Sequence, residues 1–232
     1  MRTGMKVVLL IAAGACLCCL SAAAQTAAGF TNPLVARHAD PWVYLHTDGF
    51  YYFCATVPEY DRIEIRKSET IGGLAAARPV VIWKKHPIGR MGANIWAPEL
   101  HFIDGAWYVY FAAGSSAAPY DVRLYVLQNL SADPLSASWT EKGQLRTGWD
   151  SISVDATTFA CAGIRYLVWA QRKDADMSGP LDLYIARMSN PWTIAGSPEL
   201  LSTADHLWEL RKKRTRGRLT SSRTRRDATS TI

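Results

Sequence analysis

Two aspartates stand at equivalent places in a pattern that the chain repeats. Asp40 comes directly before a proline and an aromatic segment, and Asp155 stands inside the apolar run VDATTF. An ionised carboxylate can take a proton from water, and a protonated one can supply a proton to a leaving group. Aspartate also commonly begins turns or strands, which suits Asp40 but suits Asp155 poorly. The turn-starting interpretation therefore stays open for Asp40, and Asp155 is the stronger candidate for a chemical function.

The repeat is marked by a turn followed by an aromatic segment. DGFYYFCA returns as DGAWYVYFAA and again as AGIRYLVWA, and the turn glycines Gly49, Gly105 and Gly163 are 56 and 58 residues apart. Each unit carries four strand-like segments: a short one before the turn, the aromatic one, an alternating one, and one that contains a tryptophan. The first segments are 40–46, 97–103 and 155–161, the alternating ones are 62–68, 122–128 and 181–187, and the last ones contain Trp83, Trp139 and Trp192.

Four short strands per unit, joined by tight turns, are typical of a β-propeller blade. One four-stranded sheet cannot bury both of its faces, so blades stack around an axis, and their first strands line a central channel. Asp40 and Asp155 would then meet at one mouth of that channel. No segment has the pattern of a long amphipathic helix. Three units end near Leu201, whereas propellers have typically four to eight blades.

The first residues predict export. Arg2 and Lys6 precede the apolar run 7–20, and small residues follow at 22–24, which is the pattern of a signal peptide over residues 1–24. About 14 apolar residues fall short of the roughly 20 that cross a bilayer, so we expect no membrane span. The protein is predicted to be secreted or periplasmic.

Three of the five cysteines lie in this leader: Cys16, Cys18 and Cys19. A lipid anchor on one of them stays open as an alternative. Cys54 and Cys161 each sit in an apolar segment; they could pair in an oxidising compartment, but buried free thiols are the commoner outcome. No C-x-x-C spacing indicates a zinc site.

The net charge of +6 is concentrated at the end of the chain. Residues 210–232 hold nine Lys or Arg and one Asp, a net +8, which leaves about −2 for the rest. The body is therefore not a nucleic-acid-binding surface. The basic tail could bind an acidic polymer or be a disordered, solvated segment. Because the composition changes so abruptly after Glu209, we favour a third interpretation, a shifted reading frame or truncation.

Three stretches carry a resemblance to a known family: HADPWVYLHTDGFYYF (38–53), NIWAPELHFIDGAWYVYFAAG (94–114) and SISVDATTF (151–159). In their order and spacing they resemble glycoside hydrolase family 43, five-bladed propellers of the α-L-arabinofuranosidase and β-xylosidase kind. The similarity covers about residues 30–209, so about three blades of such a propeller are expected in this all-β chain.

The resemblance implies hydrolysis with inversion of anomeric configuration. Asp40 matches the general base, and Asp155 matches the acid that orients the general acid and tunes its pKa. In inverting enzymes the two catalytic carboxyl groups lie about 6.5–9.5 Å apart, which leaves room for water. The general acid is expected shortly after Trp208 and Glu209 in a segment like Asn-Glu-Gly-Pro, but LRKKRTRGRL follows instead. No general-acid glutamate is present at that position, and Glu209 does not take its role.

Other residues receive smaller roles. Trp96 resembles the family's aromatic wall against the sugar, although it could be ordinary core. His38 lines the pocket beside Asp40 or makes a structural hydrogen bond, and Glu99 is expected to be a hydrogen-bonding partner. We expect an arabinose- or xylose-containing plant polysaccharide as substrate, a monomer, and no cofactor; a structural metal in the channel stays open. A non-catalytic carbohydrate-binding protein or an inactive fragment is the alternative function.

Overall fold

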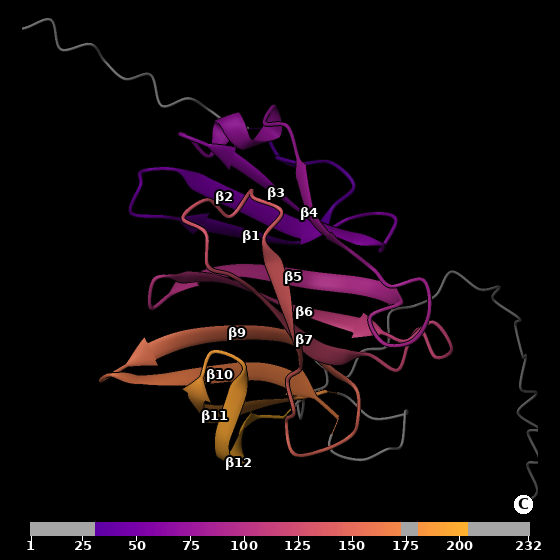
Figure 1. Ribbon diagram of the computed structural model, residues 1–232. Helices are drawn as coiled ribbons and strands as arrows, with labels where there is room; N and C mark the ends of the chain where they lie inside the picture. The colour runs from indigo at the N-terminus through magenta and orange to yellow at the C-terminus, as the bar shows by residue number, and fades with distance from the viewer. Residues whose placement is uncertain (1–30, 173–180, 204–232) are drawn as a thin grey trace, which may run out of the picture.

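The protein is described by a computed structural model that covers residues 31–172 and 181–203. Within these residues it is all-β, with twelve strands in three four-stranded antiparallel sheets and one short 3-10 helix, η1 (Gly72–Ala75). Figure 1 shows the three sheets following one another from the indigo end of the chain to the orange and yellow end. The expectations for the signal peptide (1–24), for Trp208 and Glu209 and for the basic tail (210–232) lie outside the described residues.

Each repeat forms one sheet, and the strands follow chain order from the first strand outward. Sheet 1 contains β1 (Ala39–Leu45), β2 (Tyr51–Thr56), β3 (Arg62–Ser68) and β4 (Val80–Lys84). Sheet 2 contains β5 (Ala93–Ile103), β6 (Ala106–Gly114), β7 (Arg123–Asn129) and β8 (Trp139–Gln144). Sheet 3 contains β9 (Ser153–Cys161), β10 (Ile164–Gln171), β11 (Asp182–Asn190) and β12 (Thr193–Ser202). The prediction of four strands per repeat is confirmed.

One fourth-strand tryptophan is placed differently from the prediction. Trp83 and Trp139 lie on β4 and β8, but Trp192 lies in the turn that precedes β12. The Trp192 backbone N–H donates to Asn190 Oδ1 at 3.0 Å, a side-chain-to-backbone bond two residues apart that is typical of an asparagine turn. The turn therefore ends β11 before Trp192, and the strand begins one residue later.

The backbone conformation of the turns between the first and second strands explains why glycine recurs in them. Asp104 and Gly105 have φ of 49° and 82°, and Ala162 and Gly163 have φ of 49° and 76°. Two successive residues of positive φ make the type I′ turn that suits a two-residue hairpin. Only glycine adopts this region without strain, so the repeated turn glycine is a backbone requirement.

Two apolar layers hold the sheets together. One lies between sheets 1 and 2 and includes Ile65, Leu100 and Trp107, and the other lies between sheets 2 and 3 and includes Tyr110 and Trp169. All five side chains are almost completely buried. Sheet 2 is consequently covered on both faces, and every residue of β6 is buried. This agrees with the expectation that one sheet needs neighbours on both sides.

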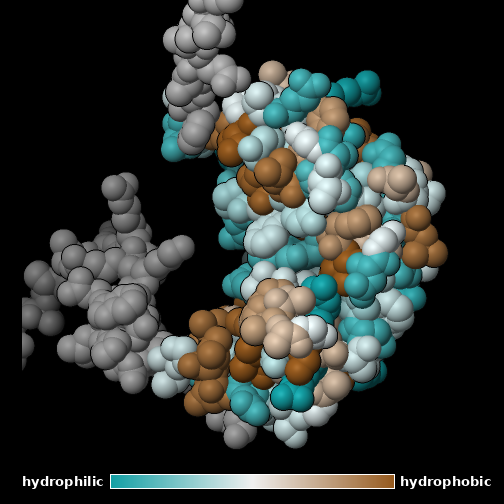
Figure 2. All heavy atoms as spheres, turned by 90° about the vertical axis from the view of Figure 1, so that its left-hand side faces the viewer, coloured by the Kyte–Doolittle hydropathy of each residue, from teal (hydrophilic) through white to brown (hydrophobic). Residues whose placement is uncertain are grey.

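The outer faces of sheets 1 and 3 are not covered by the described residues. Val43 and Leu45 of β1 are 40% and 56% exposed, and Phe159 of β9 and Leu200 of β12 are 43% and 58% exposed. In Figure 2 the described part forms a crescent with brown, hydrophobic surface near both of its ends. Contiguous exposed apolar surface of this kind commonly marks an interaction site.

The two cysteines of the described region are free and differ in environment. Cys54 is buried in β2, as expected, and its Sγ donates to the Pro98 carbonyl at 3.0 Å. Cys161 is exposed at the end of β9, so the expectation of a second buried thiol is wrong. The reason is that β9 ends beside the type I′ turn on a sheet whose outer face is open.

Candidate active site

The first strands of the three sheets lie side by side and place the candidate residues. β5 contacts β1 on one side and β9 on the other. The carboxylates of Asp40 and Asp155 therefore come from the two strands that flank β5. This agrees with the prediction that the first strands of successive units gather around one axis.

An unusual backbone conformation recurs at the same place in all three strands. Asp40, Ala97 and Asp155 have φ of 51°, 44° and 56°. At each of them, three residues of the first strand span two residues of the second strand, which makes a bulge. A non-glycine residue in this region costs about 1–3 kcal/mol and is often found at functional sites. Bulges also redirect side chains, and here they redirect the two aspartates.

The Asp40 carboxylate is held by a buried threonine. Thr56 Oγ1 donates to Asp40 Oδ2 at 2.9 Å, and the same oxygen accepts the Ala97 backbone N–H at 2.7 Å. Thr56 is only 3% exposed, whereas Asp40 faces solvent. Sequence reasoning missed Thr56. The available signal was that the repeat has Ala112 and Ala170 where the first unit has this threonine.

The Asp155 carboxyl lies close to other negative charges. Protein atoms shield its carboxyl group from part of its hydration, and the nearby carboxylates of Asp40 and Glu99 repel its charge; these effects, in that order, raise the pKa of Asp155. The residue as a whole still reaches solvent, which moderates the effect. The structure thus brings Asp40, Glu99 and Asp155 into one electrostatically coupled cluster.

Glu99 is paired rather than free. His101 Nε2 lies 3.1 Å from Glu99 Oε2, and both side chains are largely withdrawn from solvent. The contact agrees with a hydrogen-bonding function for Glu99. Its negative charge also contributes to the raised pKa of Asp155.

His38 makes the contacts of a structural histidine. Its Nδ1 lies 3.0 Å from the Ala36 carbonyl oxygen, and its Nε2 lies 3.3 Å from Glu64 Oε1. Glu64 is itself bound by Arg62 at 3.1 Å. His38 also borders an apolar cavity of about 550 Å³, next to Pro41. The cavity is lined by Asn32, Pro33, Leu34, Val35, His38, Pro41, Val43 and Phe53.

Trp96 precedes the central left-handed residue and belongs to an aromatic group. Its ring centroid lies 6.2 Å from that of Tyr60 and 6.2 Å from that of Tyr120. Trp96 is half-buried, while Tyr60 and Tyr120 are 44% and 71% exposed. Sequence reasoning missed the two tyrosines, because both lie in loops outside the repeated segments. Exposed aromatic side chains such as these are suited to stacking on a sugar ring.

Comparison with known sequences identifies the family. The family profile described as "Glycosyl hydrolases family 43" matches residues 30–216. The chain belongs to glycoside hydrolase family 43. This confirms the resemblance that the motifs around Asp40, Trp96 and Asp155 carry.

Proteins similar to this chain are named as arabinofuranosidases. The chain is 54% identical over 189 residues to an "Extracellular exo-alpha-(1->5)-L-arabinofuranosidase" of Streptomyces avermitilis, a match that covers 82% of this chain and 39% of that protein. It is 49% identical to "Alpha-L-arabinofuranosidase 43" of Humicola insolens, covering 86% and 41%. The crystal structure of an α-L-arabinofuranosidase from Lactobacillus brevis superposes with a TM-score of 0.73 at 45% identity, covering 78% and 58%. The chain thus spans about two fifths of the length of the two named relatives and 58% of the solved structure.

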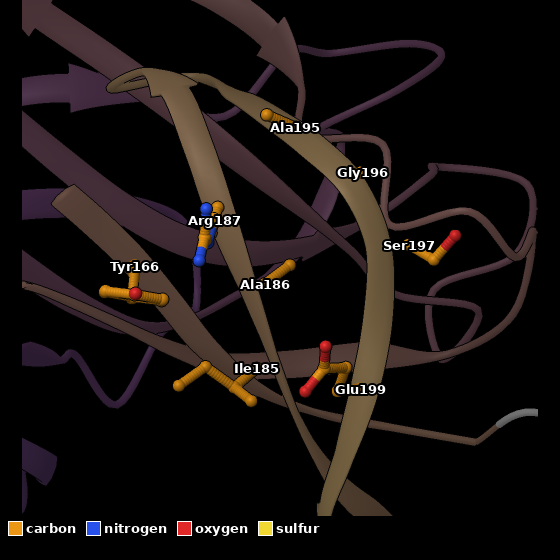
Figure 3. A pocket seen from close by; sticks show the side chains of 8 residues that line it. All are labelled: Tyr166, Ile185, Ala186, Arg187, Ala195, Gly196, Ser197 and Glu199. Atoms are coloured by element: carbon orange, nitrogen blue, oxygen red, sulfur yellow. The ribbon is translucent and has the colours of Figure 1, made fainter.

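A second pocket lies away from the family 43 carboxylates. It measures about 340 Å³ and is formed by β10, β11 and β12, with Tyr166, Arg187 and Glu199 among its lining residues (Figure 3). No residue of β1, β5 or β9 contributes to it. Because this pocket lacks Asp40 and Asp155, we place the candidate active site at the first strands of the three sheets instead.

No group of three or more His, Cys, Asp or Glu among the described residues is arranged to hold a metal ion. No helix in residues 31–172 and 181–203 is long and apolar enough to cross a membrane.

Proposed function

We propose that the chain is the carboxylate-bearing part of an inverting glycoside hydrolase of the α-L-arabinofuranosidase type, which acts on arabinose-containing polysaccharides. The observation that carries the proposal is the placement of Asp40 and Asp155 at matching left-handed positions on the two strands flanking β5. Sequence identity of about half to proteins named α-L-arabinofuranosidases supports the arabinose preference over the xylosidase alternative.

The proposed reaction assigns one task to each carboxylate. Asp40, ionised and open to solvent, takes a proton from water as the water oxygen attacks the anomeric carbon opposite the leaving group. The glycosidic C–O bond breaks, and the leaving oxygen takes a proton from a general acid. Asp155 orients that acid and, as a neighbouring negative charge, raises its pKa.

The lack of a general acid at its expected position limits the reactions that this chain catalyses alone. Its expected position follows Glu209, where the sequence has no carboxylate. Loss of acid catalysis typically reduces the rate about 10²–10⁴-fold. We therefore propose that the chain by itself hydrolyses only substrates whose leaving group departs without a proton.

We further propose a five-bladed propeller as the complete fold, with sheets 1–3 as three of its blades. The exposed apolar faces at Val43 and Leu45 and at Phe159 and Leu200 support this, because further sheets would bury them. An exported monomer that binds polysaccharide and no nucleic acid, with no cofactor in the reaction, completes the proposal.

The test uses 2,4-dinitrophenyl α-L-arabinofuranoside, whose leaving group needs no proton. We expect release of dinitrophenol by the unmodified chain and a loss of about 10²–10⁴-fold on Asp40→Asn. Asp104→Asn is the matched control, because Asp104 is an exposed aspartate with φ of 49° in a turn. Equal rates for the unmodified chain and Asp40→Asn would refute the assignment. Chelator treatment should leave the rate unchanged.

The aromatic group favours a second candidate, a carbohydrate-binding protein without catalysis. Trp96, Tyr60 and Tyr120 would then retain arabinan by stacking. In that case Trp96→Ala abolishes retention on an arabinan column, while Asp40→Asn leaves retention intact and no dinitrophenol is released by any variant.

A further inference from the structure

We infer that one position on the second strand of sheets 1 and 3 controls the carboxylate of the first strand: Thr56 positions Asp40 for water activation, and alanine at the matching position leaves Asp155 without a donor among the described residues. The inference rests on the proposed function for the catalytic consequence, but its structural part stands apart from activity.

The three positions are equivalent by strand register. Thr56 pairs with Ala39, Ala112 pairs with Trp96, and Ala170 pairs with Val154. In each sheet the partner is the residue directly before the left-handed one. The three sheets therefore share the bulge and the backbone conformation, and sheets 1 and 3 share the aspartate. They differ in whether a hydroxyl group faces the bulge.

The Thr56 hydroxyl has its direction fixed by two contacts. Its oxygen accepts the Ala97 N–H at 2.7 Å, so its single hydrogen is left for Asp40 Oδ2 at 2.9 Å. Water does not compete for the hydroxyl, because Thr56 is 3% exposed. A donor with a fixed direction restricts the orientation of the carboxylate that accepts its hydrogen. The bond engages Oδ2 alone, and Asp40 is exposed to solvent.

Asp155 has the opposite arrangement. Ala170 offers no hydroxyl, and no group within residues 31–172 and 181–203 donates a hydrogen bond to the Asp155 carboxyl. The charged groups that act on it are Asp40 from β1 and Glu99 from β5, both negative. Loss of hydration and the repulsion from these two charges both raise the pKa of Asp155. One hydroxyl thus distinguishes the Asp40 carboxylate, which accepts a hydrogen bond from Thr56, from the Asp155 carboxyl, which accepts none from the described residues.

The first experiment supplies the absent donor to Asp155. In Ala170→Ser, carboxyl-carbon NMR titration of the labelled chain should show a lower pKa of Asp155 than in the unmodified chain. Ala112→Ser is the matched control, because it adds the same hydroxyl beside Ala97, where no carboxylate stands. An unchanged Asp155 titration in a folded Ala170→Ser protein would overturn the inference for sheet 3, as would an equal shift in the control.

The second experiment removes the donor from Asp40. Thr56→Val keeps the shape of the side chain, and Thr56→Ser keeps the hydroxyl. We expect the Ala97 amide to exchange with deuterium about 10-fold faster or more in Thr56→Val, because its acceptor is gone, and at nearly the original rate in Thr56→Ser. This measurement needs no activity. Unchanged exchange in Thr56→Val would overturn the inference for sheet 1.

The catalytic consequence is read from the dinitrophenyl substrate. Thr56→Val should lower kcat about 10- to 100-fold, the effect of losing one hydrogen bond to a charged group, with KM changed less than about two-fold because Thr56 does not touch the sugar. Thr56→Ser should restore most of kcat. Thr147→Val is the control: this buried hydroxyl bonds the Trp149 carbonyl away from Asp40, so kcat should be unchanged.

The outcomes separate the inference from the proposed function. A wild-type kcat in a folded Thr56→Val protein would refute the positioning role. If the unmodified chain releases no dinitrophenol, the proposed function fails, while the Asp155 titration and the Ala97 exchange still decide whether the second-strand hydroxyl acts as inferred.

Discussion

Replacing Asp155 with asparagine should stabilise the fold at neutral pH. The pKa of Asp155 is raised by loss of hydration and by the charges of Asp40 and Glu99. A carboxyl whose pKa is higher in the folded state than in the unfolded state opposes folding when ionised. The opposition is absent below the unfolded pKa of about 3.9 and grows as pH rises through the folded pKa. Asp155→Asn removes the charge, and with it this pH-dependent cost.

The magnitude is modest, because Asp155 reaches solvent. One pKa unit corresponds to about 1.4 kcal/mol before screening, and exposed charge interactions are typically worth about 0.2–1 kcal/mol. We expect a gain of about 0.5–1 kcal/mol at pH 7. For a chain of this size that is an increase in Tm of roughly 1–4 °C.

The assay is thermal unfolding at pH 4 and pH 7 for the unmodified chain, Asp155→Asn and the control Asp104→Asn. The gain from Asp155→Asn should be full at pH 7 and fall to roughly half or less at pH 4, close to the unfolded pKa, whereas Asp104→Asn should change Tm little at either pH. In an Asp40→Asn background the gain should shrink, because one repelling charge is gone. A lower Tm for Asp155→Asn at pH 7, or an equal gain at both pH values, would refute the electrostatic reasoning.

Three other predictions concern the core and the surface. Trp107→Leu should lower the free energy of unfolding by about 2–4 kcal/mol in urea titrations, because Trp107 is fully buried between sheets 1 and 2; a loss under about 1 kcal/mol would contradict the packing. Iodoacetamide followed by peptide mapping should label Cys161 within minutes and Cys54 only after unfolding, since Cys161 is exposed and burial raises the pKa of Cys54; equal labelling would show the burial to be wrong. Leu200→Ser should reduce aggregation measured by light scattering, because Leu200 is 58% exposed on an uncovered sheet face. Unchanged scattering would show that this face does not drive aggregation.

The strands were predictable because their signals are local. Alternating apolar residues and Asp-Gly or Ala-Gly turns depend on neighbours within a few residues. The alternating segment predicted at 62–68 coincides with β3 (Arg62–Ser68). The exception was Trp192, where the asparagine turn competes with the strand and moves the boundary.

The candidate site was predictable only in outline. The repeat placed Asp40 and Asp155 at corresponding positions, and their convergence follows from any ring-like packing of the first strands. The role of Thr56 beside Asp40 was not predictable, because the direction of its hydroxyl is set by a bond to Ala97, 41 positions away in the sequence. Nothing in a threonine at the end of a strand indicates which neighbouring sheet it will meet.

The sequence by itself determined the repeating four-strand unit, its turn glycines and the two carboxylates at matching points, because all of these are encoded over short distances along the chain. Only the tertiary structure decided that the bulges turn the aspartates toward one cluster, that Thr56 binds one of them, and that Cys161 is exposed. These features depend on which sheets pack together and which faces remain uncovered, and that is set by contacts between residues far apart in sequence.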